Sequence, residues 1–269
     1  MVELSPLGFG VSGAHGTPFV PPSRTRNLIN AAVAGGVRYF DTAPSYGAGE
    51  CERRLGQSLK QLGRSDIVVS TKAGLSSHGI AGRRRDLSPE GVEKSVRGSL
   101  GRLELEGVDL LILHGAAPHE LNAALLERLR ALKQAGAYRW LGATGRGAAL
   151  DWALDAGWFD VLMAPVHPFL GAEEEAVLDR AKAGGCGVIA IETAGDAPPA
   201  LRAPRGLADL YPLAKRLRGA APGRGRVRHP EGIRQAMERP GVISTLFTTT
   251  RVRHLQDNLS RAPLSRPDV

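Results

Sequence analysis

The chain contains little cysteine, few aromatic residues and no long hydrophobic run, and these absences exclude several classes of protein. Among its 269 residues there are two cysteines, Cys51 and Cys186, which form neither a disulfide framework nor a metal-ligand pattern. No apolar stretch approaches the roughly 18–20 residues that a transmembrane helix needs, and the first ten residues lack the pattern of a secretory signal. We therefore expect a cytoplasmic protein without a metal site or a membrane partner.

The positive charge of the chain is concentrated in short segments. The 35 Lys and Arg residues outnumber the 27 Asp and Glu residues, which gives a formal net charge of +8. Much of the excess lies at 83–85 and 223–229, which we interpret as basic loops, either solvated surface or sites that attract an anion such as phosphate. Because 5% of the residues are aromatic and none interleave with these runs, no nucleic-acid partner is expected.

Short apolar runs recur along the chain, and each is followed by a segment with helical periodicity. Strands are predicted near 7–13, 37–42, 66–72, 108–114, 140–144, 159–165, 187–192 and 241–249, and helices near 24–34, 50–62, from 88, and at 122–135, 148–156, 173–183, 207–217, 230–238 and 252–259. Strands that are apolar along their length are buried on both faces, which favours a parallel sheet. Eight such units predict a single (β/α)8 TIM barrel domain over residues 1–269, with a loose tail from about 260. An open doubly wound sheet is the alternative, but its G-x-G-x-x-G turn after the first strand is missing.

Polar side chains stand at the carboxyl ends of successive predicted strands, where the functional site of such a barrel lies. Asp41, Lys72 and His114 each end a strand, and Tyr46 lies in the loop that follows Asp41. A neighbouring lysine lowers the pKa of a tyrosine, and an aspartate keeps that lysine charged. A histidine can hydrogen-bond the oxygen of a carbonyl substrate. Each residue alone has an ordinary structural explanation, whereas the four together predict a proton-transfer site.

The motifs that carry these residues resemble a known family. DTAPSYGAGECERRLG, which contains Asp41 and Tyr46, resembles the signature of the aldo-keto reductases. STKAG resembles the lysine strand of that family and LLILHG its histidine strand, and the similarity continues in order as far as HLQDNL. The resemblance implies a (β/α)8 barrel, an NADPH cofactor and reduction of a small aldehyde or ketone. It also implies Tyr46 as the general acid, tuned by Lys72 and Asp41, with His114 orienting the carbonyl.

The second half of the chain departs from the pattern of that family around the nicotinamide. Thr144 and Gly145 stand where the family has the Ser-Asn pair that holds the nicotinamide amide. Met163 replaces an expected glutamine, and Ile191 replaces the aromatic residue under the nicotinamide ring. Glu192 begins the segment that is normally Ser-Pro-Leu. The loss of several interactions at about 1 kcal/mol each would weaken cofactor affinity about a thousandfold.

The adenosine end of the implied cofactor site is also altered. Thr248 and His254 stand where the family favours a basic residue and an arginine for the 2′-phosphate, while Asn258 is kept. Arg251 is a further source of charge for that phosphate. The candidate cofactor-binding residues are therefore Thr144, Thr248, Thr249, Thr250, Arg251, His254 and Asn258.

Three functions are compatible with this pattern. The first is an NADPH-dependent reductase, or the reverse alcohol dehydrogenase, acting on a small carbonyl compound. The second is a cofactor-independent acid–base enzyme, such as a dehydratase, isomerase or cyclase of a polar metabolite, that reuses the same four residues. In that case Glu192 adds a carboxylate to the pocket, and the alternative is that Glu192 forms a salt bridge with an arginine. His167 is a separate candidate for the lining of the pocket. The third is a binding or regulatory module without turnover. The sequence contains no pattern that indicates the oligomeric state.

Overall fold

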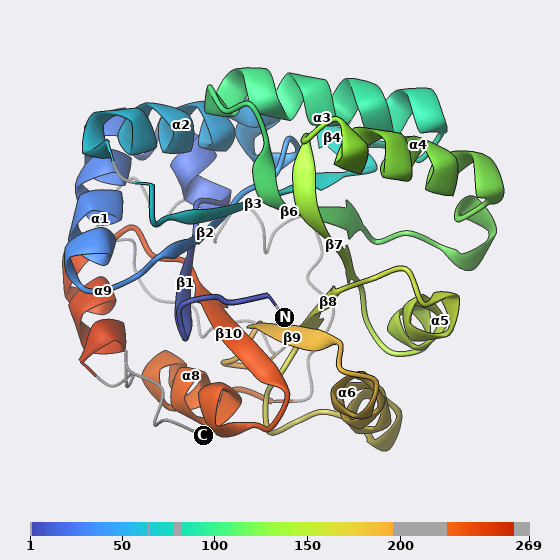
Figure 1. Ribbon diagram of the computed structural model, residues 1–269. Coiled ribbons are helices and arrows are strands. Elements are labelled where there is room, and N and C mark those ends of the chain that lie inside the picture. Colours follow the sequence, from blue (N-terminus) through green and yellow to red (C-terminus); the bar gives the residue numbers. More distant parts are fainter. Residues whose placement is uncertain (1, 64, 78–81, 196–224, 261–269) are drawn as a thin grey trace.

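The computed structural model describes residues 2–63, 65–77, 82–195 and 225–260. Eight parallel strands close into a barrel in the order β1-β10-β9-β8-β7-β6-β3-β2 (Figure 1). These strands are β1 (Leu7–Gly10), β2 (Tyr39–Asp41), β3 (Val68–Ala73), β6 (Val108–His114), β7 (Tyr138–Thr144), β8 (Val161–Pro165), β9 (Gly187–Ile191) and β10 (Val242–Phe247). The predicted (β/α)8 barrel is confirmed. The predicted helix at 207–217 and the tail beyond 260 lie outside the described residues.

Helices surround the ring of strands on the outside (Figure 1). They are α1 (Pro22–Ala34), α2 (Glu50–Leu62), α3 (Pro89–Leu103), α4 (Ala123–Gln134), α5 (Ala148–Ala156), α6 (Ala172–Ala183), α8 (His229–Glu238) and α9 (Val252–Leu259). Their starts follow local chemistry, as at α3, where the Ser88 hydroxyl accepts a hydrogen bond from the Gly91 amide at 3.0 Å and Pro89 occupies the first turn. None of the helices in the described ranges is long and apolar enough to cross a membrane.

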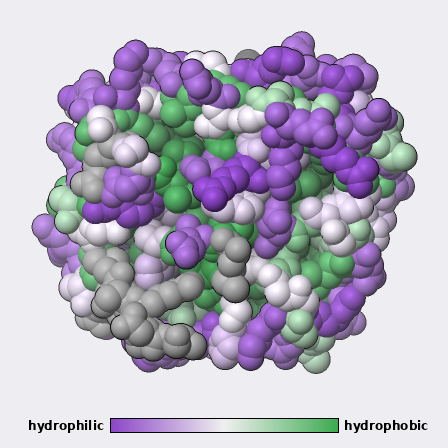
Figure 2. All heavy atoms as spheres, viewed as in Figure 1, coloured by the Kyte–Doolittle hydropathy of each residue, from purple (hydrophilic) through white to green (hydrophobic). Residues whose placement is uncertain are grey.

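The inside of the barrel is filled by side chains from alternate strand positions. Tyr39, Ile112, Met163 and Ile189 belong to one buried cluster there, together with Val2 of the amino-terminal segment. This segment lies over the middle of the ring in Figure 1, so it covers the amino end of the barrel. In the same view hydrophilic side chains cover most of the rim, and hydrophobic ones show between them nearer the middle (Figure 2). The opposite, carboxyl end of the strands is where the functional site of a (β/α)8 barrel lies.

A two-stranded antiparallel hairpin interrupts the alternation of strands and helices between β3 and α3. It pairs β4 (Leu75–Ser77) with β5 (Arg83–Arg85), with Leu75 opposite Arg85 and Ser77 opposite Arg83. The interpretation of 83–85 as a loop is thus wrong. All three arginines are exposed, so the strand carries none of the apolar alternation by which a half-buried strand is recognised in a sequence.

The helical layer includes one very close approach, at Gly56 of α2. A Cβ atom added to Gly56 would lie 2.3 Å from the Leu103 carbonyl oxygen at the end of α3, so only glycine fits this contact. Gly101 of α3 is exposed, and a Cβ there would meet nothing within 4 Å. Gly56 of α2 therefore lies in a tight helix contact, whereas Gly101 of the adjacent helix α3 faces open space.

We predict that Gly56→Ala destabilises the fold by about 1–3 kcal/mol, because α2 and α3 must separate to admit the methyl group. Gly101→Ala is the matched control and should stabilise the fold by about 0.5–1 kcal/mol, since alanine favours a helix more than glycine does. Urea denaturation of both variants measures the difference. Equal effects of the two substitutions would contradict the packing described for α2 and α3.

Candidate active site

The strand register gathers four polar side chains at the carboxyl end of the barrel. Asp41 ends β2, and Lys72 lies near the end of β3, which pairs with β2 on one side and β6 on the other. His114 ends β6, and Tyr46 begins the short 3-10 helix η2 (Tyr46–Gly49) after β2. We call Asp41, Tyr46, Lys72 and His114 the tetrad. Because β2, β3 and β6 are adjacent, the barrel brings together residues that are up to 73 positions apart in the chain.

The Asp41 carboxylate and the Lys72 ammonium form a buried ion pair. The Lys72 Nζ atom donates to both carboxylate oxygens, at 2.6 Å and 2.5 Å, and to the Thr42 carbonyl oxygen at 3.0 Å. Lys72 is 2% exposed and Asp41 4%. Burial alone would lower the pKa of Lys72, but the charge and hydrogen bonds of Asp41, together with Tyr46, outweigh it and raise this pKa. The lysine therefore stays charged throughout the neutral range.

Behind the ion pair, two further side chains hold Asp41 in place. The Ser70 hydroxyl donates to Asp41 Oδ1 at 2.7 Å, and it lies 2.9 Å from the Tyr39 hydroxyl, which therefore donates to Ser70. Both residues are fully buried. Neither residue was predicted from the sequence, although the sequence contains a signal for both. Tyr39 precedes Asp41 by two positions, and Ser70 precedes Lys72 by two, so strand periodicity puts each on the same face as its partner.

Tyr46 is positioned beside Lys72 by a tight turn. Gly47 has a φ of 60°, and a Cβ atom there would lie 2.4 Å from the Gly16 carbonyl oxygen, so the turn depends on glycine. The Lys72 Nζ atom is 5.1 Å from the centroid of the phenol ring. Burial raises the pKa of Tyr46 above its usual value, and the Lys72 charge offsets only part of this rise. The lysine acts in the predicted direction, but desolvation is stronger, so the phenol remains protonated at neutral pH.

The His114 imidazole lies edge to face with the Tyr46 ring, with 6.4 Å between the ring centroids. Burial, followed by the charges of Lys72, Arg83 and Arg85, lowers the pKa of His114 to about 3. This histidine is therefore neutral at physiological pH. Its Nδ1 atom is buried and has no hydrogen-bond partner within the described residues. A neutral imidazole beside a protonated phenol provides two hydrogen-bond donors at one mouth.

A buried carboxylate fixes α2, which follows the Tyr46 turn, against the barrel. Glu52 is fully buried and accepts hydrogen bonds from the Thr71 hydroxyl of β3 and from Arg102 Nε of α3, each at 2.6 Å. Thr71 is next to Lys72 in the chain. Glu52 thus ties the tyrosine segment, the lysine strand and α3 together. Its place three residues before Leu55, within the apolar face of α2, was the sequence signal for such a buried role.

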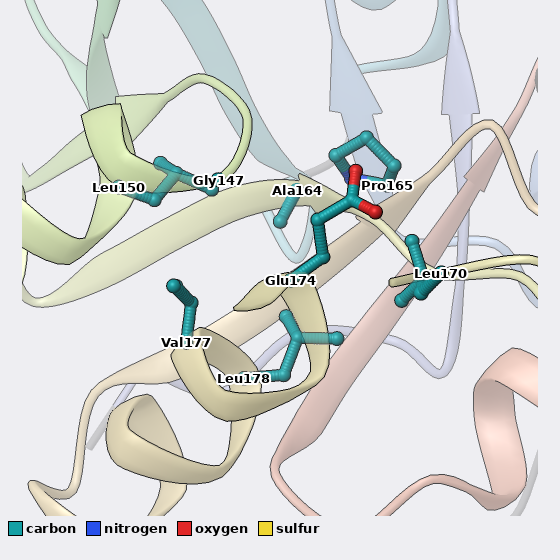
Figure 3. Close-up of a pocket in the computed structure, with 8 residues that line it drawn as sticks. All are labelled: Gly147, Leu150, Ala164, Pro165, Leu170, Glu174, Val177 and Leu178. Carbon is teal, nitrogen blue, oxygen red and sulfur yellow. The ribbon is translucent and has the colours of Figure 1, made fainter. Parts of the chain in front are cut away.

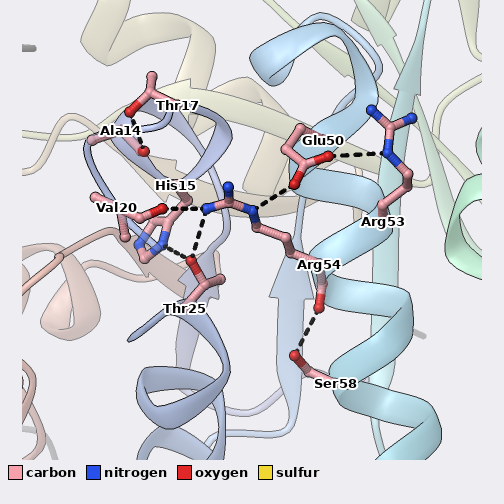
Figure 4. A network of polar contacts seen from close by, with 9 residues as sticks. All are labelled: Ala14, His15, Thr17, Val20, Thr25, Glu50, Arg53, Arg54 and Ser58. Atoms are coloured by element: carbon pink, nitrogen blue, oxygen red, sulfur yellow. Dashed lines mark hydrogen bonds and ion pairs between the residues drawn. The ribbon is translucent and has the colours of Figure 1, made fainter. Parts of the chain in front are cut away.

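A second polar network connects the segment after β1 with α1 and α2 (Figure 4), and His15 extends it to the loop after β10. The His15 ring is fully buried, with Nδ1 3.1 Å from the Thr25 hydroxyl and Nε2 3.0 Å from the Thr249 carbonyl oxygen. Because a carbonyl can only accept, Nε2 carries the proton. Arg54 extends the network from α2 by donating to the Val20 carbonyl oxygen at 2.7 Å. This network fixes the position of the candidate cofactor loop relative to the tetrad.

The candidate cofactor residues lie on two sides of the barrel mouth. Thr144 ends β7 and is in register with His114. The others lie in the loop after β10 and in α9, and they are Thr248, Thr249, Thr250, Arg251, His254 and Asn258. Thr248 and His254 are exposed, whereas Asn258 is buried. The Thr249 hydroxyl accepts a hydrogen bond from the Arg251 amide at 3.2 Å, which shapes the start of α9.

The replaced nicotinamide residues have structural roles. Met163 is buried in the barrel interior, and Ile191 packs against the same cluster. Glu192, a candidate for the substrate pocket, forms an ion pair with Arg146, which connects the loops after β7 and β9. The salt-bridge alternative for Glu192 is therefore the one observed. His167, the other pocket candidate, is buried, and its Nδ1 accepts a hydrogen bond from the Phe169 amide at 3.2 Å.

Two hollows in the described part of the chain lie away from the tetrad. One, of about 10 Å³, is lined by apolar side chains of β8, α5 and α6 together with Glu174 (Figure 3). The other, of about 520 Å³, is lined by Gly63, Ser65, Gly107 and Asp109, near the amino ends of β3 and β6. Neither hollow is lined by a tetrad residue. The candidate active site is therefore identified by the proton-handling side chains of the tetrad and not by the volume of a hollow. The described residues include no group of three or more potential metal ligands.

Comparison with known proteins connects this arrangement to one family. The model of the aldo/keto reductase family matches residues 6–198. The chain is 32% identical over 234 residues to L-galactose dehydrogenase of Arabidopsis thaliana, and the match covers 82% of this chain and 70% of that protein. It is 30% identical over 197 residues to NADH-specific methylglyoxal reductase of Escherichia coli, where the match covers 67% of this chain and 58% of the relative. The chain thus spans less than two thirds of the second protein.

Solved structures show the same fold. An aldo-keto reductase from Bacillus halodurans, solved in its holo form, superposes on this chain with a TM-score of 0.76 at 21% identity. The superposition covers 99% of this chain and 89% of that one. At this level of identity the likeness supports the barrel and its topology alone.

The ion pair predicts how the site responds to removal of charge. Lys72→Met leaves Asp41 buried without its cation and should destabilise the protein by about 3–5 kcal/mol in urea denaturation. The double variant Asp41→Asn/Lys72→Met removes both charges and should recover much of this loss. A double variant that is no more stable than Lys72→Met would contradict the pairing.

Proposed function

Because this chain belongs to the aldo/keto reductase family, we propose that it is an NADPH-dependent oxidoreductase that reduces a small aldehyde or ketone, or oxidises the corresponding alcohol. The observation that carries the proposal is the buried Asp41–Lys72 pair beside the protonated Tyr46 phenol, with neutral His114 against the same ring. The named activities of the relatives, one dehydrogenase and one reductase, support redox chemistry in either direction.

The tetrad side chains have complementary tasks in the reducing direction. When bound, the reduced nicotinamide supplies a hydride, which carries the two electrons and forms the new C–H bond at the carbonyl carbon. The Tyr46 hydroxyl donates its proton to the carbonyl oxygen, which becomes the alcohol O–H. Lys72 stabilises the negative charge left on the phenol oxygen, and Asp41 keeps Lys72 charged. His114 donates a hydrogen bond to the same carbonyl oxygen and orients it.

The residues after β10 fit the phosphate end of a dinucleotide. His15 fixes this loop through the Thr249 carbonyl, and Arg251 and Arg253 at the start of α9 supply positive charge for phosphate groups. A further basic group lies nearby at the start of α8, where an Arg226 guanidinium nitrogen is 2.7 Å from His229 Nε2. Burial, then Arg226 and His254, lower the pKa of His229. This concentration of positive charge favours NADPH, whose 2′-phosphate adds negative charge, over NADH.

The cofactor-independent alternative has less support. The carboxylate that it would have added to the pocket, Glu192, is paired with Arg146. The relatives named above act as a dehydrogenase and a reductase, which need a hydride donor or acceptor. We therefore propose hydride transfer, and a direct test of cofactor binding separates the two functions.

We expect the purified protein to bind NADPH in calorimetric titration, and to bind it more tightly than NADH. Tyr46→Phe should retain this binding but lower turnover of aldehydes by about 10²–10⁴-fold, because the proton donor is lost. Tyr138→Phe is the matched control. Its hydroxyl donates to the Leu129 carbonyl oxygen at 2.8 Å near the amino end of β7, remote from the tetrad. Turnover without added cofactor, or full activity of Tyr46→Phe, would refute the proposal.

The pKa shifts predict the pH dependence of the reaction. Since burial raises the pKa of Tyr46 above its usual value, the general acid stays protonated at neutral pH, and reductive kcat/KM should fall only in the strongly alkaline range. The pKa of His114 is lowered to about 3, so no change is expected near its usual 6.5. Alcohol oxidation needs the phenolate and should speed up as the pH rises. An inflection of reductive kcat/KM near pH 6.5 that disappears in His114→Gln would contradict this assignment.

A further inference from the structure

The β4–β5 hairpin stands between the Tyr46 turn and the loop that follows His114. β4 packs against η2, which begins at Tyr46. On the other side, Arg85 of β5 donates hydrogen bonds to the carbonyl oxygen of Gly115, directly after His114, and to the Glu120 carboxylate. The hairpin is closed at its base by a hydrogen bond from the Asp86 amide to the Gly74 carbonyl oxygen at 3.0 Å. It therefore borders the tetrad as a fixed element.

The three arginines of β5 do not face the same way. Successive side chains of a strand alternate between its two faces, so Arg83 and Arg85 share the face toward the tetrad and Arg84 lies on the other. Arg85 is engaged by Glu120, whereas the exposed side chain of Arg83 has no hydrogen bond or ion pair with any described residue. Among the described residues, the Arg83 guanidinium on the tetrad side of the hairpin thus keeps its donors for a ligand.

Electrostatic effects agree with this placement. Burial and the charge of Lys72 are the largest causes of the lowered pKa of His114, and the charge of Arg83 is the next. The same charge opposes the rise that burial causes in the pKa of Tyr46. Arg84 acts on neither group and instead lowers the pKa of Asp86, after the effects of Ser88 and burial. The charge of Arg83 thus acts on both proton-handling side chains, in agreement with its place on the tetrad side of the strand.

We propose that Arg83 binds an anionic group, a carboxylate or a phosphate, carried by the carbonyl substrate. A planar guanidinium pairs with either group through two parallel hydrogen bonds, which fixes orientation as well as position. The candidate cofactor residues after β10 are separated from β3 and its hairpin by β1 and β2, so Arg83 lies apart from the proposed phosphate contacts of the cofactor. This inference rests on the proposed function for the reaction itself, and it narrows the substrates to anionic aldehydes and ketones.

The binding of simple anions tests this site without any turnover. Succinate and inorganic phosphate are titrated calorimetrically into the wild type, Arg83→Gln, Arg83→Lys and the matched control Arg84→Gln. At least one anion should bind the wild type and Arg84→Gln with equal affinity. Its affinity for Arg83→Gln should be lower by about tenfold or more, and its affinity for Arg83→Lys should be intermediate. Which of the two anions binds distinguishes a carboxylate site from a phosphate site. Failure of both to bind, or equal weakening by Arg83→Gln and Arg84→Gln, overturns the proposal.

Turnover of matched aldehydes then tests whether the site selects substrates. The value of kcat/KM with NADPH is compared for succinic semialdehyde against butanal, and for glyceraldehyde 3-phosphate against glyceraldehyde. In the wild type and Arg84→Gln one anionic aldehyde should be preferred, and Arg83→Gln should lower that preference about tenfold or more. An unchanged preference in Arg83→Gln overturns the inference and leaves the reductase proposal standing. If no aldehyde is reduced, the proposed reaction fails, and the anion titration alone decides whether Arg83 binds anions.

Discussion

The buried ion pair between Asp41 and Lys72 is the interaction on which the candidate site depends. Burying either ion alone would cost several kcal/mol, and the barrel avoids this cost by surrounding both with partners. The Lys72 ammonium donates to three oxygen acceptors, and the Asp41 carboxylate also accepts a hydrogen bond from the Ser70 hydroxyl. This arrangement follows from strand register, because Asp41 of β2 is aligned with Ser70 of β3, two residues before Lys72. The fold thus creates the site by setting two strands side by side.

Burial, more than the ion pair, determines the protonation states of the two residues beside it. Tyr46 remains a phenol because burial outweighs the nearby lysine, and His114 remains a neutral imidazole because burial and surrounding cations oppose its protonation. Both can therefore donate a hydrogen bond at neutral pH. Lys72 supplies a positive charge over the Tyr46 ring, 5.1 Å from its centroid, and the charge of Arg83 on the hairpin also acts on Tyr46 by lowering its pKa. Such a setting suits an oxygen atom that gains negative charge and a proton in the same step.

Much of this architecture could be predicted from the sequence, because apolar strands and amphipathic helices have strong periodic signals. The positions of Asp41, Lys72 and His114 at strand ends followed directly from those signals. The β4–β5 hairpin was missed because an exposed strand of three arginines has no apolar alternation. The pairing of Arg146 with Glu192 joins loops whose strands are separated by β8, so strand order alone does not indicate it. The raised pKa of Tyr46 depends on desolvation by tertiary packing, which a list of neighbouring residues does not reveal.

Transfer of deuterium from cofactor to product tests the central claim most directly. The protein is incubated with NADPH that carries deuterium at both C4 positions and with the panel of neutral and anionic aldehydes, and the products are analysed by mass spectrometry. The account predicts one deuterium on the former carbonyl carbon of the alcohol product, and loss of that product in Tyr46→Phe. A product formed without deuterium, or formed equally well without cofactor, would contradict hydride transfer and assign the tetrad to acid–base chemistry alone.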